Sequence, residues 1–253
     1  MPRTSSAPSS SQDARTGASE RLRLKLELVV PALALPGRIL LEHPRARVLF
    51  PRYLATAYQA GRAMVPLMET ALERARELGA DDPVAEGLAA YLERHIPEET
   101  HSDEPGGAVL DDLEALGLDA AALRTELPPP KIAALVGAQY YWIFHYHPVA
   151  ILGFLALEAY PPHNETLERL IEQTGLPRDG FRQLVFHAKV DVAHARELHR
   201  VLDSLPLEPY HEQLIGVSAL QTVALWTDAV LDALQEKSAG GGTRTLMRAE
   251  AHT

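Results

Sequence analysis

The chain contains no cysteine, and this absence removes several classes of chemistry at once. Disulfides, iron–sulfur clusters, thiolate zinc sites and a cysteine nucleophile all require a thiol, so none of them is available to this protein. Basic residues are also in deficit, with 24 Lys and Arg against 34 Asp and Glu. The formal net charge of −10 argues against nucleic acid as a partner, because phosphate binding requires a basic surface.

Long hydrophobic runs are scarce as well. The longest candidate, residues 148–159, is too short to cross a bilayer and contains Glu158. The first twenty residues are rich in Ser, Ala and Thr and lack the apolar segment of a secretion signal. We therefore expect a cytoplasmic protein with no membrane partner. One domain is expected at residues 21–236, between a disordered N-terminal tail at residues 1–20 and a flexible C-terminal tail at residues 237–253.

Alternating β-branched residues are rare, whereas Ala, Leu, Glu and Arg dominate, and this pattern predicts an all-α fold. Pro51 and Pro66 mark expected breaks or kinks within a long helix, Pro97 an interruption, and Pro148 a kink. Helices are predicted at residues 20–30, 37–42, 45–78, 82–103, 110–116, 119–125, 131–160, 164–174, 179–204 and 210–236.

The most informative pattern is His187-x-x-x-Asp191-x-x-His194, in the helix predicted from Asp179 as its N-cap. At 100° per residue, these three side chains fall within an arc of about 60° on one helix face. Leucines continue this face, and Lys189 and two arginines occupy the opposite one. Two imidazoles and a carboxylate that point the same way suit iron, manganese or zinc. A single inward histidine is usually a core residue, but three inward polar groups each need a partner.

Glu98 and His101 stand at i, i+3, a spacing that lets both side chains bind one metal ion. Glu-x-x-His is also the pairing of helical carboxylate-bridged diiron proteins. The alternative is a solvated acidic segment, since the surroundings are polar. Glu99 replaces Glu98 as the ligand if Pro97 shifts the helical register, although the spacing favours Glu98.

Glu158 follows a strongly apolar helix and shares a stripe with large hydrophobic residues. A carboxylate on a buried stripe destabilises the fold by several kcal/mol unless it is paired or bound to metal. The alternative is a helix-end glutamate that reaches solvent beside Pro161. His147 lies about three turns earlier on a similar bearing, where it either lines the same cavity or packs in the core.

The order of these motifs resembles the heme-oxygenase-like diiron oxidases and oxygenases. The resemblance rests on Glu-x-x-His, a lone glutamate after the apolar segment "HPVAILGFLALE", and His-x-x-x-Asp-x-x-His, and it covers about residues 84–205. It implies a single helical bundle of about seven helices, two Fe(II) ions, and O2 as co-substrate through a peroxo-diferric intermediate. It further implies that one dimetal site is shared by Glu98, His101, Glu158, His187, Asp191 and His194.

Members of that family include fatty-acid decarboxylases, amino-acid fragmenting or cyclising oxidases and N-oxygenases, so the resemblance implies oxidation of an amino-acid- or fatty-acid-derived small molecule in biosynthesis. Homodimers are common on the scaffold, and a homodimer is compatible with this chain. A thiaminase-like or cofactor-processing protein of the same scaffold without iron is the first alternative, although the thiaminase branch uses a thiol that this chain lacks. A non-catalytic helical interaction module, in which the six residues come together by accident, is the second.

Overall fold

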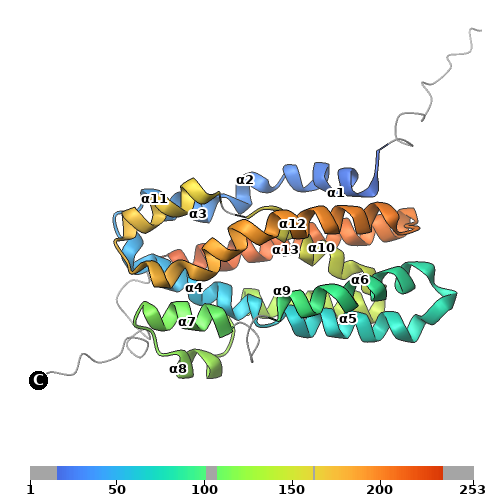
Figure 1. Ribbon diagram of the computed structural model, residues 1–253, viewed down its shortest axis with the longest axis horizontal. Helices are drawn as coiled ribbons and strands as arrows, with labels where there is room; N and C mark the ends of the chain where they lie inside the picture. Colours follow the sequence, from blue (N-terminus) through green and yellow to red (C-terminus); the bar gives the residue numbers. More distant parts are fainter. Residues whose placement is uncertain (1–15, 101–106, 162, 236–253) are drawn as a thin grey trace, which may run out of the picture.

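Helices make up most of the described chain. The computed structural model describes residues 16–100, 107–161 and 163–235, and none of these residues lies in a β-strand. The predicted all-α fold is therefore confirmed, although these residues form more helical segments than the seven expected (Figure 1). The α-helices are α1 (Ala18–Glu27), α2 (Val30–Leu33), α3 (Leu35–Glu42), α4 (Ala46–Gly61), α5 (Met64–Leu78), α6 (Pro83–Glu99), α7 (Gly107–Ala115), α8 (Ala120–Thr125), α9 (Pro130–His145), α10 (Ile151–Leu155), α11 (Asn164–Thr174), α12 (Arg182–Ser204) and α13 (Pro209–Leu234). Short 3-10 segments are η2 (Gly79–Asp81), η3 (Pro148–Ala150), η4 (Ala156–Ala159) and η5 (Arg178–Phe181).

The chain ends were predicted to be tails. α1 begins at Ala18, inside the segment assigned to the N-terminal tail. Residues 1–15 and 236–253, which make up most of the two predicted tails, lie outside the described residues.

The helices do not break at Pro51, Pro66 or Pro97, where breaks or kinks were expected. The chain breaks between α4 and α5, at Arg62 and Ala63, whereas Pro51 and Pro66 lie inside those two helices. Pro66 is the third residue of α5, where a backbone N–H would have no intrahelical acceptor, so the ring is tolerated. Pro97 likewise lies inside α6, and the interruption predicted there is wrong.

The chain between α9 and α11 is broken where a single kinked helix was predicted over residues 131–160. α9 ends at His145, and His147 adopts an extended backbone (φ −151°, ψ 138°). A following proline favours this conformation, because its ring clashes with a helical residue before it. The break directs His147 to Asp82 at the start of α6, with 3.0 Å between Nε2 and Oδ2. His147 therefore packs away from the candidate ligands, against another part of the bundle.

Two hydrophobic cores lie toward opposite ends of the bundle. α1, α5, α6 and α10 build one of them, on the right in Figure 1. α3, α4, α7, α8 and α11 build the other, on the left. α13 runs through both, with Leu214 and Val223 in the first core and Val230 and Leu234 in the second.

α13 is long and apolar enough, by length and composition, to cross a membrane, so the expectation that no segment has that length is wrong. This helix packs against α4, α9 and α10 in the middle of the bundle, and 56% of its apolar window is buried there. A core helix passes the same test, so α13 gives only weak support for a membrane span.

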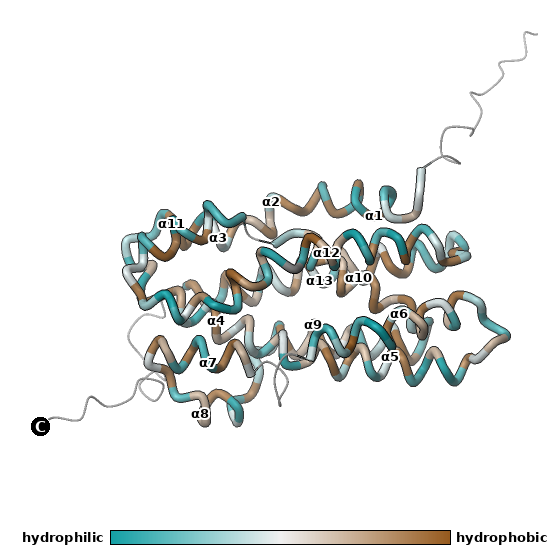
Figure 2. The backbone as a smooth tube through the Cα atoms, viewed as in Figure 1, coloured by the Kyte–Doolittle hydropathy of each residue, from teal (hydrophilic) through white to brown (hydrophobic). Residues whose placement is uncertain are grey.

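α12 connects the two cores and carries polar residues between them. Its first turns pack against the second core, and Leu198 and Val201 belong to the first. His187, Asp191 and His194 fall in the intervening stretch. Figure 2 shows hydrophilic and hydrophobic residues alternating along α12, as expected for a helix with one buried side. Its basic residues are exposed as predicted: Lys189, Arg196 and Arg200.

Candidate metal centre

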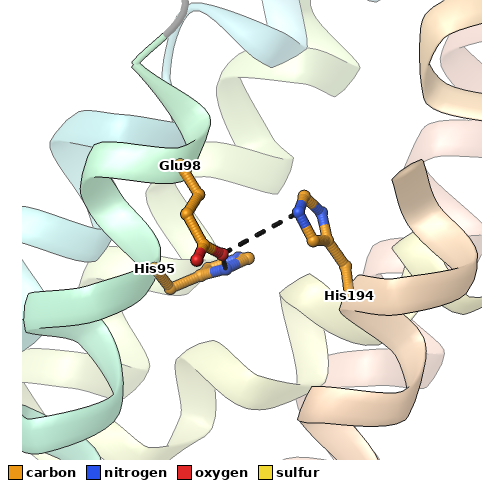
Figure 3. Close-up of side chains that lie close together, drawn as sticks. All are labelled: His95, Glu98 and His194. Atoms are coloured by element: carbon orange, nitrogen blue, oxygen red, sulfur yellow. Dashed lines mark ion pairs between the residues drawn. The ribbon is translucent and has the colours of Figure 1, made fainter.

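The last turns of α6 and the middle of α12 present histidine and glutamate side chains to each other (Figure 3). His194 Nε2 lies 4.0 Å from Glu98 Oε2, and His194 Nδ1 lies 3.1 Å from Glu99 Oε1. His95 stands one turn earlier on α6, with its ring centroid 5.1 Å from that of His194. Nitrogen and oxygen donors from two helices therefore converge in one place.

Glu158 joins this cluster from η4, which packs against α12. Its Oε2 lies 3.7 Å from His95 Nε2 and 3.7 Å from His194 Nδ1. The side chain is 16% exposed, so Glu158 does not extend into solvent as a helix-end glutamate would. The apolar run before it thus ends in a carboxylate that faces two imidazoles.

The adjacent glutamates of α6 differ in burial. The Glu99 side chain is 4% exposed and the Glu98 side chain 51%, so Glu99 points inward and Glu98 reaches the cluster from its rim. Glu98 was favoured by spacing and Glu99 is favoured by burial; both lie within reach of His194. His101, the other half of the predicted Glu-x-x-His pair, lies outside the described residues.

His187 and Asp191 form a hydrogen-bonded pair beside the cluster. His187 Nδ1 lies 2.9 Å from Asp191 Oδ1, and His187 Nε2 lies 2.8 Å from Gln183 Nε2. A carboxylate only accepts, so Nδ1 carries the hydrogen and donates it to Asp191. Nε2 consequently accepts a hydrogen bond from the Gln183 amide. Both ring nitrogens of His187 are occupied, in contrast to those of His95.

Several nitrogen and oxygen atoms of the cluster that could bind a metal are buried without a hydrogen-bond partner. They are His95 Nδ1 and Nε2, Glu99 Oε1, Glu158 Oε1 and His194 Nδ1. Buried polar atoms are nearly always paired, so a group of unpaired atoms that face one another indicates a missing partner. Donors about 2.1 Å from one metal ion lie about 3.0–3.4 Å apart at right or tetrahedral angles. The 3.1 Å between Glu99 and His194 falls in that range, and the 3.7 Å contacts of Glu158 need only a small contraction. The residues present therefore fit a metal ion.

The electrostatics of the cluster also favour a cation. In the described part of the chain, no lysine or arginine pairs with Glu98, Glu99 or Glu158. Burial, followed by repulsion from Glu158, raises the pKa of the Glu99 carboxyl group. Burial opposes the charged form of His95, but the Glu158, Glu99 and Glu98 carboxylates outweigh it and raise the pKa of that imidazole. Excess negative charge is thus held where a proton or a metal ion would neutralise it.

The sequence analysis missed His95. The missed signal is the stripe Leu88, Leu92, His95 and Glu99 on α6, whose steps of three and four residues return to one helix face. His95 is 1% exposed and stacks on Tyr91 at 5.0 Å between ring centroids. His95 and Glu99 both point inward and lie one turn apart, as two ligands of one metal ion on a helix would. The sequence analysis looked for such a pair only at Glu98 and His101.

Comparison with known proteins adds a family and a fold. Residues 98–227 match a family described as iron-containing redox enzymes. No curated protein matches the chain in sequence. A domain of unknown function with a heme oxygenase-like fold from Shewanella denitrificans superposes with a TM-score of 0.72 at 16% identity, covering 84% of this chain and 90% of that one.

Two further solved structures share the architecture. A TenA homolog from Pseudomonas syringae gives a TM-score of 0.62 at 12% identity, over 93% of this chain and 99% of the other. A CADD-like protein of unknown function from Nostoc punctiforme gives 0.58 at 16% identity, over 86% and 99%. At these identities the likeness concerns the fold, which is the heme-oxygenase-like helical fold that the sequence resemblance implied.

Proposed function

The chain belongs to the iron-containing redox enzyme family, and from that premise we propose that it is an O2-dependent non-heme diiron oxidoreductase. Its substrate is a small molecule, derived from an amino acid or a fatty acid. The observation that carries the proposal is the set of buried, unpaired nitrogen and oxygen atoms of His95, Glu99, Glu158 and His194. Imidazole and carboxylate donors together are the ligands that non-heme iron prefers.

In this proposal, His95, Glu99, Glu158 and His194 hold iron with the donor atoms that already face one another. Glu98 adds a carboxylate from the rim. Two groups of three donors are close enough to share an ion, His95 with Glu98 and His194, and His95 with Glu99 and Glu158. Ferrous ions bound there would supply electrons to dioxygen.

The surrounding residues prepare the site for such chemistry. Apolar side chains of the first core surround its inner side, which lowers the local dielectric and strengthens each ligand interaction. Asp191 accepts the Nδ1–H of His187 and so fixes the orientation and tautomer of that ring. His187 then needs only to exchange the Gln183 amide for a metal ion at Nε2 to become a ligand.

Metal binding tests the proposal directly. Anaerobic reconstitution of the full chain with Fe(II) should give close to two equivalents of iron, and air should then produce a transient visible absorption. His95→Ala and Glu99→Ala should each lower iron uptake at least about tenfold, because each removes a donor from the centre.

His163→Ala is the matched control, since His163 is exposed at the start of α11 and should bind no iron. A chain that takes up no iron contradicts the proposal. The proposal is also contradicted if His163→Ala lowers iron uptake as much as His95→Ala and Glu99→Ala do.

A further inference from the structure

A cavity of about 330 Å³ lies between α7 and the start of α12. Ligand pockets commonly measure about 300–1,000 Å³, so this one is sized for a small molecule. Phe186, a residue that is 37% exposed, gives it an apolar wall. The lining residues are Ala108, Asp111, Asp112, Arg182, Gln183 and Phe186.

The charges of the cavity do not balance. Asp112 is buried and fully engaged, because it accepts the backbone N–H of Gln183 at 2.8 Å and Arg182 Nε–H at 3.3 Å. Asp111 is exposed, and no basic side chain of the described residues pairs with it. Two carboxylates against one guanidinium leave one negative charge, located at Asp111. A ligand that complements this cavity therefore carries a positive group.

The cavity adjoins the candidate metal centre through one side chain. Gln183 lines the cavity and donates its amide to His187 Nε2. His187 lies on α12 two turns before His194, one of the residues of the candidate metal centre. A molecule held beside Gln183 is thus separated from this centre by two side chains, those of Gln183 and His187.

We propose that this cavity binds the substrate, and that the substrate is an organic ammonium compound with an apolar chain. The ammonium group pairs with Asp111, and the apolar chain lies against the exposed part of Phe186. The inference rests on the proposed function only in treating the bound amine as a substrate; the binding itself requires no iron.

A matched set of six-carbon probes tests this inference on the full chain, freed of metal by a chelator. n-Hexylammonium, n-hexanoate and n-hexanol share one apolar chain and differ only in the polar group. Calorimetric titration should show n-hexylammonium binding at least about tenfold more tightly than the other two, as expected for one charge-assisted hydrogen bond.

Asp111→Asn should remove most of that preference, because it keeps the shape of the side chain and deletes the charge. Glu114→Gln makes the same charge change one turn later on α7, outside the cavity lining, and should leave the preference intact. Equal binding of the three probes overturns the inference, and so does an equal loss in both variants. Iron uptake is measured separately: a chain that binds iron without the amine contradicts only the amine site, and the reverse result contradicts only the diiron proposal.

Discussion

Glu99 is the candidate ligand at which metal binding and the stability of the metal-free chain should oppose each other. It is buried and faces a second carboxylate, so its ionised form is unfavourable, and its pKa is raised. Glu99→Gln should therefore stabilise the metal-free chain by about 1 kcal/mol at pH 7, while it weakens iron binding. Urea unfolding in the presence of a chelator measures the first effect.

The raised pKa of Glu99 also predicts how the stability of the metal-free chain changes with pH. Because the folded pKa is raised, the folded state binds the Glu99 proton more tightly than the unfolded state, whose pKa is near 4.5. Protonation of Glu99 therefore stabilises the folded state at low pH. This stabilisation is lost as the pH rises above 4.5 through the folded pKa. Glu99→Gln should remove that decline, and Glu98→Gln, at a half-exposed site, should change it less. A destabilised Glu99→Gln chain would contradict this account.

Gln183 makes a second prediction at the level of one residue. Its amide occupies His187 Nε2, the nitrogen that a metal ion would need. Gln183→Ala should raise Fe(II) affinity about fivefold, because the metal no longer displaces a hydrogen bond with a net value of about 1 kcal/mol. Anaerobic competition with a chelator of known affinity measures the change. Weaker iron binding in this variant would show instead that Gln183 supports His187 as a ligand.

At the level of helices, the contact between α10 and α13 sets the position of Glu158. Gly153 allows this contact: a Cβ there would lie 2.7 Å from Ala219 N, 2.8 Å from Ser218 Cβ and even closer to Ile215 O. Gly153→Ala should destabilise the protein by about 2–3 kcal/mol, since backbone atoms of α13 must move. The shift should also reduce iron uptake, because η4 and Glu158 follow α10 directly.

Gly137→Ala on α9 provides the matched control for thermal unfolding. A Cβ at Gly137 meets no atom within 4 Å, and alanine is the better helix former. This variant should be stabilised by up to about 1 kcal/mol with unchanged iron uptake. Equal effects of the two substitutions would contradict the close approach of α10 and α13.

For the whole molecule, metal binding and stability should be linked, because the ligands come from three separate segments, α6, η4 and α12. Fe(II) at a hundred times its Kd should stabilise the folded chain by about 2.7 kcal/mol. For a protein of this length, that corresponds to a rise in Tm of roughly 5–10 °C. Anaerobic calorimetry with and without a chelator measures the shift, and an unchanged Tm at saturating iron would contradict a centre that joins these segments.

This stabilisation should also depend on pH. The metal displaces protons from its ligands, and the pKa values of Glu99 and His95 are both raised. Protons therefore compete more strongly as the pH falls, and the Tm shift should be smaller at pH 6 than at pH 7.5.

Periodicity predicted the helical character of the chain and the polar face of α12, because both depend on neighbours within a few residues. α11 and its closure by Gly175, with φ of 58°, agree with the prediction. Asp179 was expected to cap the helix of residues 179–204, yet it lies in η5, and α12 begins at Arg182. The carboxylate that accepts a hydrogen bond from the α12 N-terminus is Asp112 of α7, about seventy residues away, a contact that local pattern does not contain.

The sequence by itself determined that the chain is helical, that it lacks thiol chemistry, and that α12 presents two histidines and an aspartate on one side. These properties follow from residue type and from the 3.6-residue period. Only the tertiary structure decided that His95 and Glu99 lie beside Glu158 and His194. It also decided that His147 contacts Asp82 and not this cluster. The physical reason is that such meetings depend on where helices break and how closely they pack, and those choices minimise the free energy of the whole bundle.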